Sequence, residues 1–411
     1  MNKVTESLRY ILTVILAMGI ILSTISCGKS DKSGAETLAD GVYDVVYLGV
    51  KDYGEDGTTK ENIANFRYRF LADGNEKILS IDNSLMDDSG TPLYPIQNRL
   101  KENYKFHITV NDGTVTDTEE IRETEGTFKP VVEGKPGEKT LINFIRTALM
   151  PVGTTLYIYG GGWDWQDEGS AIQARTLGVS PDWVKFFNEH DVNYTFRDID
   201  DDESKRDPKT SYFPFGSYNE YYYAGLDCSG FVGWVIYNTF ETENGKDGYV
   251  CSSTKMAGRL AGYGWGDFSQ EMPGIADEND IRLLPGDVVS IKGHVWISLG
   301  TCEDGSILIV HSTNGHVSRT GQPGGGVALS AVGRDTNCEA YRLADKYMSK
   351  YYPEWYSRYP VSLSDPEKYL KIEGDTAGRF SWNTAGGAGL TDEARVQDMT
   401  PAQVISLCFG E

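Results

Sequence analysis

The chain has 411 residues, of which 39% are hydrophobic and 24% are charged, and its formal net charge is −22. This length suits two or three domains, and the composition excludes a disordered or membrane-embedded protein. Because a polyanion would be repelled by this charge, we expect no nucleic-acid partner.

The first residues have the features of an export signal. Basic residues precede an apolar run at 11–22 that is too short to span a bilayer. Small residues then lead to Cys27, and the segment resembles the lipobox of bacterial lipoproteins, although Thr24 stands where that family usually has Leu. We therefore expect a signal peptide at 1–26, a lipid on Cys27 and a tether at 27–37, holding the protein at the outer face of the cytoplasmic membrane. A plain secretory signal in which Cys27 has no role is the alternative.

Residues 38–128 carry the alternating pattern of short strands. An Asn-Asp-Gly sequence at 111–113 predicts a tight hairpin turn between two of them. We predict a small β-barrel or sandwich, of the SH3-like or OB-like kind, without visible chemistry. His107 lies on one strand, and we interpret it as a packed or surface residue rather than a ligand. The expected strands are 43–50, 66–71, 106–110 and 114–119.

A linker with two prolines and several charges is predicted at 129–139. Helical spacing of apolar residues follows at 140–149, and a Tyr- and Gly-rich segment follows at 156–162. A further helix is predicted from Ser180, which suits an N-cap, to about His190.

Cys228 begins a predicted helix with the sequence Asp-Cys-Ser-Gly-Phe-Val. The free N–H groups and the dipole at a helix N-terminus stabilise a thiolate, so we expect its pKa to be lowered toward neutrality. The same N–H groups are placed to stabilise an oxyanion. Ser229 and Gly230 are small, and we expect them to leave the sulfur accessible. A buried core cysteine is the alternative, and this motif alone does not decide between them.

Two histidines downstream complete a candidate catalytic set. Residues 284–289 predict a turn that enters a strand, and His294 opens the next strand. Asp304-Gly305 predicts a hairpin turn, and the returning strand from Ile307 reaches His311. A thiol nucleophile needs an imidazole that takes its proton, and that imidazole needs a polar partner to fix its tautomer.

In this order, the motifs resemble those of the NlpC-type cell-wall peptidases of the papain-like superfamily. The resemblance covers roughly residues 138–335. It rests on Y-x-x-G-G from Tyr157, D-C-S-G-F-V around Cys228, P-G-D-V-V, G-H-V-x-I-x-L-G around His294, and H-S-T from His311. It implies that Cys228 is the nucleophile, His294 the base and His311 the residue that orients the base.

The resemblance also implies a reaction and substrate contacts. Family members hydrolyse the bond between D-Glu and the diamino acid in peptidoglycan stem peptides, through a thioester and without a metal or cofactor. Tyr157 would lie near the nucleophile, and Asp227 would hold the free amine of the substrate's N-terminal L-Ala. Ser229 is a further candidate for substrate binding. Trp296 is another, and it stands where the family usually has Gly.

The register of the predicted hairpin bears on the third catalytic residue. A two-residue turn would set His311 opposite Ser298, about 13 Å along the strand from His294. It would set His316 opposite Gly293, nearer the base. A wider loop or a bulge would bring His311 back into range. Both histidines therefore remain candidates for the third catalytic residue, and the motif favours His311.

An unusually long segment separates two of the motifs, because Tyr157 and Cys228 lie 71 positions apart (228 − 157). We interpret residues 163–223 as an insertion that covers part of the cleft or displaces Tyr157. An outward excursion that packs on the N-terminal β-domain is the alternative. Its aromatic residues suit a peptide or glycan: Tyr212, Phe213, Phe215, Tyr218, Tyr221 and Tyr222.

We therefore expect an α+β fold with a papain-like catalytic domain at 140–345. A helix led by Cys228 would pack on an antiparallel sheet that carries His294 and His311, and residues 346–411 would form an extension packed on this domain. The rival functions are a non-catalytic cell-wall binding or scaffold lipoprotein, and a related amidase or acyltransferase.

The remaining cysteines have irregular spacing without a Cys-x-x-Cys pair, so we expect no zinc site. We expect Cys228 alone to be needed for hydrolysis. The others are Cys251, Cys302, Cys338 and Cys408.

Overall fold

The computed structural model describes residues 38–53, 64–81, 103–121, 128–164, 168–189, 222–274, 281–321, 323–385 and 387–411. Several sequence predictions fall outside these residues. They are the signal peptide and tether at 1–37 with the lipidation site Cys27, the helix end at His190, and the aromatic residues of the insertion from Tyr212 to Tyr221.

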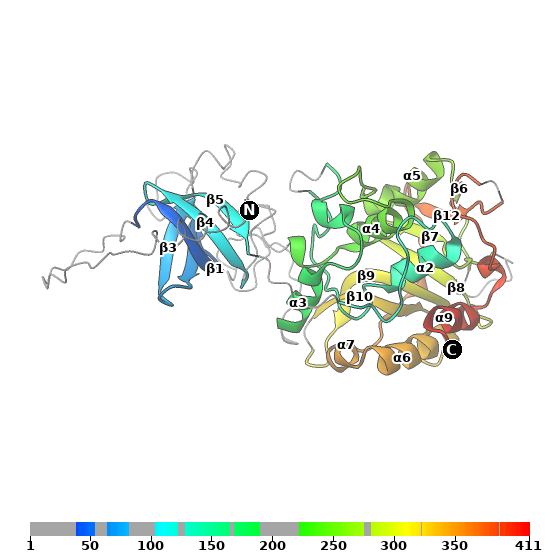
Figure 1. Ribbon diagram of the computed structural model, residues 1–411. Helices are drawn as coiled ribbons and strands as arrows, with labels where there is room; N and C mark the ends of the chain where they lie inside the picture. Colours follow the sequence, from blue (N-terminus) through cyan, green and yellow to red (C-terminus); the bar gives the residue numbers. More distant parts are fainter. Residues whose placement is uncertain are drawn as a thin grey trace, which may run out of the picture. The chain divides into compact units, whose positions relative to one another are not determined.

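Five strands in the N-terminal part close into a barrel in the order β1-β2-β3-β5-β4. The sequence did not decide between a barrel and a sandwich, and the structure has a barrel (Figure 1). Alternate residues point inward and fill it with aromatic and β-branched side chains, among them Val45, Tyr47, Phe66, Tyr68 and Ile108. The strands are β1 (Gly41–Tyr53), β2 (Ala64–Phe70), β3 (Glu76–Ile81), β4 (Lys105–Asn111) and β5 (Thr114–Glu120).

The predicted hairpin turn connects β4 and β5. Asp112 and Gly113 adopt φ angles of 48° and 76°, as a tight two-residue turn between antiparallel strands requires. His107 on β4 lies on the surface, with its Nδ1 2.7 Å from a carboxylate oxygen of Asp44 on β1.

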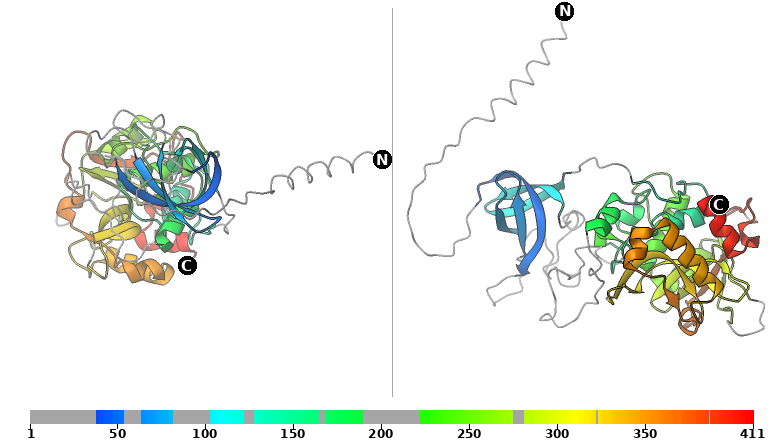
Figure 2. Two further views of the ribbon diagram at one scale, coloured as in Figure 1. Left: turned by 90° about the vertical axis from the view of Figure 1, so that its left-hand side faces the viewer. Right: turned by 90° about the horizontal axis from the view of Figure 1, so that it is seen from below.

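A second sheet of seven strands follows, in the order β11-β10-β9-β8-β7-β12-β6 (Figures 1 and 2). Neighbours are antiparallel except β10 and β11, which are parallel. With its helices, this sheet makes the chain an α+β protein. The strands are β6 (Gly266–Ser269), β7 (Val288–Ile291), β8 (His294–Thr301), β9 (Ile307–Val317), β10 (Pro323–Val332), β11 (Leu363–Ser364) and β12 (Gly378–Trp382).

The predicted helices at 140–149 and from Ser180 are present as α2 and α3, and Thr140 caps α2 through the N–H of Asn143. Within the described part of the chain, no helix combines the length and the apolar character that crossing a membrane requires. The helices are α2 (Leu141–Leu149), α3 (Pro181–Glu189), α4 (Cys228–Phe240), α5 (Met256–Gly262), α6 (Glu339–Tyr351), α7 (Pro353–Arg358), α8 (Pro366–Tyr369) and α9 (Pro401–Phe409).

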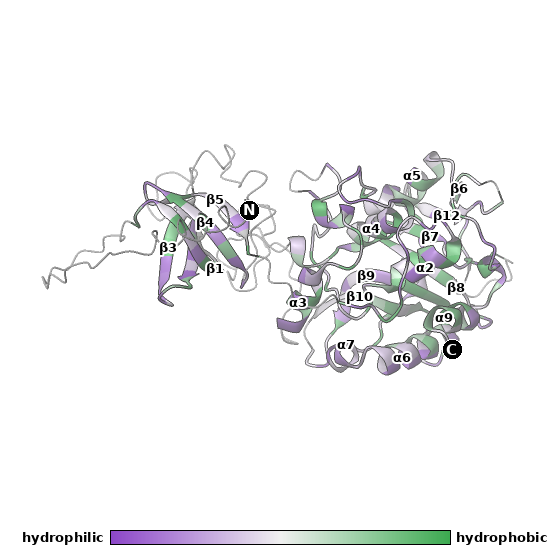
Figure 3. Ribbon diagram, viewed as in Figure 1, coloured by the Kyte–Doolittle hydropathy of each residue, from purple (hydrophilic) through white to green (hydrophobic). Residues whose placement is uncertain are grey.

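The two faces of the seven-stranded sheet pack against different parts of the chain. Val295 and Ile297 of β8 belong to the main core, which also includes apolar residues of α2, α4, α6 and α9 (Figure 3). Trp296 between them points to the opposite face and joins a smaller cluster. We call these the helix face and the loop face. The loop-face cluster is Leu283, Val289, Ile291, Trp296, Ile307, Ile309 and Val332, covered by Met272, Tyr369, Leu370 and Ile372.

The C-terminal residues, expected as an extension packed on the catalytic domain, supply two members of this sheet. β12 lies between β7 and β6, so that Phe380 pairs with Val288 on one side and with Phe268 on the other. β11 forms the opposite edge beside β10. Residues after 345 are therefore integral to the sheet that carries the histidines.

Candidate catalytic site

Cys228 is the first residue of α4, and the residues around it fix the start of this helix. The carboxylate of Asp227 accepts hydrogen bonds from the N–H of Gly230 at 2.6 Å and the hydroxyl of Ser229 at 2.9 Å. The indole N–H of Trp163 donates to Ser229 Oγ at 3.0 Å. In this structure Asp227 acts as the N-cap, and Ser229 links that cap to the first residue of the insertion.

The Gly-rich segment after Tyr157 lies directly against the start of α4. The N–H of Asp227 donates to Gly161 O at 2.9 Å. A Cβ on Gly162 would lie 2.7 Å from Gly230 Cα, and a Cβ on Gly230 would lie 1.9 Å from Gly161 O, so both positions require glycine. The long insertion therefore leaves this segment in place beside the helix. Tyr157 itself is half-buried, and its N–H donates to a carbonyl of β10.

The Cys228 thiol is only 6% exposed, which corrects the expectation of an accessible sulfur. Burial raises its pKa to about 12, and the nearby Asp227 carboxylate adds to this shift. Hydrogen bonds from the N–H groups of Val295 and Ser229 lower the pKa by less. The predicted shift toward neutrality is therefore wrong for this structure, because the exclusion of water outweighs the helix N-terminus.

Three side chains from adjacent strands form a hydrogen-bonded chain. His294 Nε2 lies 2.9 Å from His311 Nδ1, and His311 Nε2 lies 3.1 Å from Ser330 Oγ. Burial lowers the pKa of His294 to about 4. It also lowers the pKa of His311 well below its usual value, and His294 and His316 add to that effect. Both imidazoles are therefore neutral at pH 7.

A widened turn and a bulge bring His311 to His294. The turn closes between Cys302 and Ser306 rather than around two residues, and the register shifts once more between Ser298 and Gly300. Ile297 then pairs with Val310, which sets His311 beside Trp296 instead of Ser298. The tight two-residue turn is therefore not formed, and a wider loop together with a bulge brings His311 into range.

His316, the other candidate for the third residue, does not bond to His294. Its Nδ1 lies 3.3 Å from the carbonyl of Pro360, and its ring centroid is 6.2 Å from that of His311. Burial lowers its pKa to about 4.

Tyr369, which the sequence reasoning missed, lies over the histidine pair. Its ring centroid is 5.5 Å from that of His294 and 5.9 Å from that of His311. Trp163 and Ser330 were also missed. Trp163 directly follows the Gly-rich segment, which was a usable signal, but nothing in the sequence connects Tyr369 with residues 294 and 311.

Trp296, expected to contact substrate, is fully buried on the loop face, 6.4 Å from the Tyr369 ring. Its indole N–H has no hydrogen-bond partner among the described residues. It thus lies beneath the layer that covers the histidines, and no part of it faces solvent.

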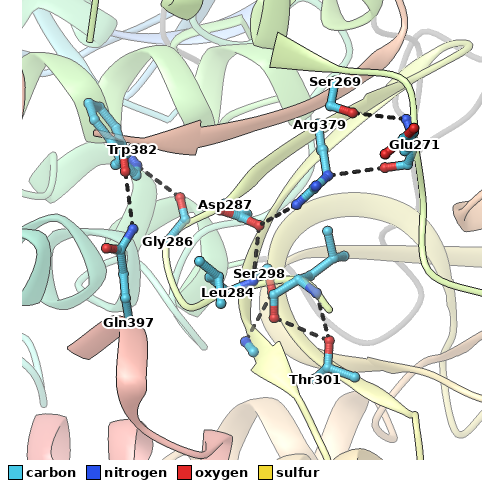
Figure 4. A network of polar contacts seen from close by, with 12 residues as sticks. Ser269, Glu271, Leu284, Gly286, Asp287, Ser298, Thr301, Arg379, Trp382 and Gln397 are labelled. Atoms are coloured by element: carbon cyan, nitrogen blue, oxygen red, sulfur yellow. Dashed lines mark hydrogen bonds and ion pairs between the residues drawn. The ribbon is translucent and has the colours of Figure 1, made fainter. Parts of the chain in front are cut away.

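A polar network holds the turn that leads into the histidine-bearing hairpin (Figure 4). Asp287 is completely buried, accepts a hydrogen bond from the N–H of Leu284 at 3.0 Å, and has Arg379 of β12 at 3.9 Å. Burial raises the pKa of Asp287 to about 7. The indole N–H of Trp382 donates to Gly286 O at 2.9 Å. The C-terminal strand therefore anchors the Pro-Gly-Asp turn.

One group of possible metal ligands occurs among the described residues, formed by Cys302, Asp304 and Glu339 at the end of β8 remote from His294. The Asp304 carboxylate accepts hydrogen bonds from Ser306 and from the N–H of Glu339. The Glu339 carboxylate accepts one from the N–H of Glu303. These side chains join the β8–β9 turn to α6, and they form no part of the arrangement around Cys228.

Comparison of the chain with protein-family models, with curated proteins and with solved structures finds no match.

Proposed function

We propose that this chain is a cysteine peptidase of the bacterial cell wall, of the NlpC type, with Cys228 as nucleophile and His294 as base. One observation carries the proposal. The thiol at the start of α4 lies against the N–H of Val295, and the residue before Val295 is His294, whose ring bonds to His311. A thiol, an imidazole and a polar group that orients the imidazole are the parts that thiol-dependent amide hydrolysis needs.

Two sets of tautomers satisfy these hydrogen bonds, and the proposed mechanism uses the one that leaves a ring nitrogen of His294 free to accept a proton. If His294 donates from Nε2 to His311 Nδ1, then His311 carries its proton on Nε2 and donates to Ser330 Oγ. This leaves Nδ1 of His294 unprotonated and able to take the thiol proton. His311 is thus proposed as the residue that fixes the tautomer of the base.

The proposed reaction has two stages. His294 removes the thiol proton as Cys228 Sγ bonds to the amide carbon, and the carbonyl electron pair moves onto oxygen. N–H groups of Val295 and of the first turn of α4 are candidate donors to that oxyanion. When the C–N bond breaks, His294 returns the proton to the departing amine. Water, deprotonated by His294, then cleaves the thioester and releases the acid and the thiol.

The proposed substrates are peptidoglycan stem peptides, cleaved between D-Glu and the diamino acid. Tyr157, Asp227 and Ser229 are proposed to contact the stem, whereas the buried Trp296 would do so only after the layer over it moves. No metal or cofactor takes part in the proposed steps.

The test is to incubate the purified full chain with defined stem peptides that contain diaminopimelate or Lys, and to identify the fragments by mass. We expect cleavage of the amide bond between the carbonyl of D-Glu and the α-amino nitrogen of the diamino acid. We expect no cleavage by Cys228→Ala. Cleavage at another bond would refute the proposed specificity, and equal cleavage by Cys228→Ala would refute the mechanism.

The near-complete burial of Cys228 favours a second candidate function, a cell-wall binding lipoprotein without turnover. The same stem peptides distinguish the two. Saturable binding without fragments, under conditions in which Cys228 reacts with a thiol reagent, would favour the binding protein.

Membrane attachment through Cys27 is part of the proposal, and it rests on the lipobox-like segment alone. We expect the wild-type protein in the membrane fraction and Cys27→Ala in the soluble fraction. Equal membrane recovery of both would remove lipidation from the proposal.

A further inference from the structure

An aromatic side chain from outside the motif-bearing residues lies against the two histidines. Tyr369 is the last residue of α8, and its ring lies edge-on to His294 and His311 at centroid distances of 5.5 and 5.9 Å. Burial raises the pKa of its hydroxyl, hydrogen bonds from Ser364 and Thr313 oppose that shift, and the Cys228 thiol adds to it. The ring therefore lies against both histidines, and the electrostatic influence of Cys228 reaches its hydroxyl.

The segment that carries Tyr369, residues 363–372, is fixed at both ends. β11 pairs with β10, and Asp365 caps the single turn of α8 through the N–H of Glu367 at 3.0 Å. After Tyr369, Leu370 and Ile372 pack on the loop-face cluster around Trp296. Between these anchors, none of the four residues of α8 is fully buried. We call this stretch the Tyr369 segment.

The side chain beneath this segment has an unused donor. The indole N–H of Trp296 is buried without a hydrogen-bond partner among the described residues, 6.4 Å ring to ring from Tyr369. Leaving such a donor unpaired costs about 1–3 kcal/mol. A substrate carbonyl admitted beside His294 would supply the acceptor that the closed arrangement lacks.

A groove of about 850 Å³ is lined in part by the Tyr369 segment. Its volume is within the range typical of ligand sites. Its lining includes Pro366, Glu367, Leu370 and Lys371 of the segment, with Pro273, Gly274 and Arg334 across from them.

We propose that Tyr369 is a specificity-determining residue of the site, closing it over Cys228 and His294 and yielding to substrates that enter from the adjoining groove. The closed arrangement keeps the thiol buried and the histidines neutral. Displacement of the ring opens the thiol to the substrate and exposes the Trp296 N–H as a donor. The identity of the substrate rests on the proposed function, whereas the closure itself rests on the geometry.

The closure is tested without any peptide, by measuring how fast iodoacetamide alkylates Cys228 in the full chain at neutral pH, with the labelled peptide identified by mass. We expect Tyr369→Ala to raise this rate at least roughly tenfold, since the ring that shields the thiol is gone. Tyr369→Phe keeps the ring and should stay within about twofold of the wild type. Tyr356→Ala is the matched control, because this tyrosine in the same C-terminal region bonds to Asp345. An unchanged rate in Tyr369→Ala overturns the proposal.

Labelling of the buried Cys251 and Cys302 monitors folding in the same samples. If Tyr369→Ala labels these as well, the comparison moves to Tyr369→Leu, which keeps apolar contact with the loop-face cluster. A rate equal to the wild type in that variant overturns the proposal.

Stem-peptide cleavage separates this inference from the proposed function. We expect Tyr369→Ala to change the ratio of kcat/KM for free stems to that for cross-linked stems at least roughly fivefold, and an unchanged ratio refutes the role in specificity. Faster alkylation with no cleavage by any variant refutes the peptidase and leaves the closure. Cleavage by the wild type, together with an unchanged alkylation rate in Tyr369→Ala, refutes the closure and leaves the peptidase.

Discussion

The helix face and the loop face of the seven-stranded sheet contribute to the site in different ways. On the helix face, α4 places Cys228 at its first turn, and the Gly-rich segment after Tyr157 packs against it. On the loop face, Trp296 and Tyr369 enclose the histidines, and the covering residues come from much further along the chain. The helix face thus positions Cys228, whereas the loop face covers the histidines.

This difference matters for reactivity because burial dominates the electrostatics of the site. A helix N-terminus is worth up to about 2 kcal/mol to a nearby charge. The pKa of Cys228 nevertheless rises to about 12. Burial therefore outweighs the helix N-terminus at this thiol.

The largest effect should follow from removing the nucleophile on the helix face. We expect Cys228→Ala to lower stem-peptide hydrolysis by about 10⁴-fold or more, because general-base and covalent catalysis are lost together. Cys251→Ala and Cys302→Ala should keep most of the activity. Fragment analysis by mass measures all three, and full activity in Cys228→Ala would break the assignment.

The next effect separates the two histidines on β9. We expect His311→Ala to lower kcat about 10³-fold, because His294 loses the partner that fixes its tautomer. His316→Ala should lower kcat less than about tenfold, since His316 bonds to a backbone carbonyl instead. Steady-state kinetics decide between them, and a larger loss in His316→Ala would reverse the order.

Stability should reveal how strongly the C-terminal strand supports the sheet. Trp382 packs edge-on against Phe144 at 5.1 Å, and its N–H bonds to Gly286 O. We expect Trp382→Ala to lower the free energy of unfolding by about 3–5 kcal/mol and Trp382→Phe by about 1 kcal/mol. Urea denaturation measures both. The partly exposed Leu407→Ala is the control, and an equal loss there would remove the special role of β12.

The smallest effect concerns the pH dependence of stability through Asp287. Its pKa is about 7 in the folded protein, against an ordinary value of 3.8. Between pH 5 and pH 7 the folded state therefore holds a proton that the unfolded state has lost, so stability falls as the pH rises. We expect a loss of about 2–3 kcal/mol over this range relative to Asp287→Asn, which does not titrate. Urea midpoints at both pH values measure it, and parallel curves for the two proteins would contradict it.

Local patterns predicted the elements that carry Cys228, His294 and His311. The helix beginning at Cys228, the strand opening at His294 and the strand that returns to His311 all occur where the sequence places them. Each depends on residues close together in the chain, through capping, alternation and turn chemistry. The Asn-Asp-Gly turn of the barrel succeeded for the same reason.

Contacts between distant parts of the chain were not predictable in this way. The bulge near Gly300, where φ is 115°, changes the partner of His311 without a clear sequence signal. The strand at 378–382 is short, and its formation depends on pairing with β6 and β7. Tyr369 reaches the histidines only because β11 and the loop-face cluster hold its segment there. Propensity and period carry no information on such pairings.

The position of β12 inside the sheet also determines when the sheet can be completed during synthesis. In the described sheet β6 pairs with β12, and β7 has β12 as one of its two neighbours, yet β12 is made long after both. Until Gly378–Trp382 leaves the ribosome, β6 and β7 present open backbone edges, and the turn at Gly286 lacks its indole donor. A nascent chain that stops before residue 378 therefore contains every residue of the Cys228 and His294 motifs but cannot complete the sheet that holds them. The complete site can therefore form only after residues 378–382 have been synthesised.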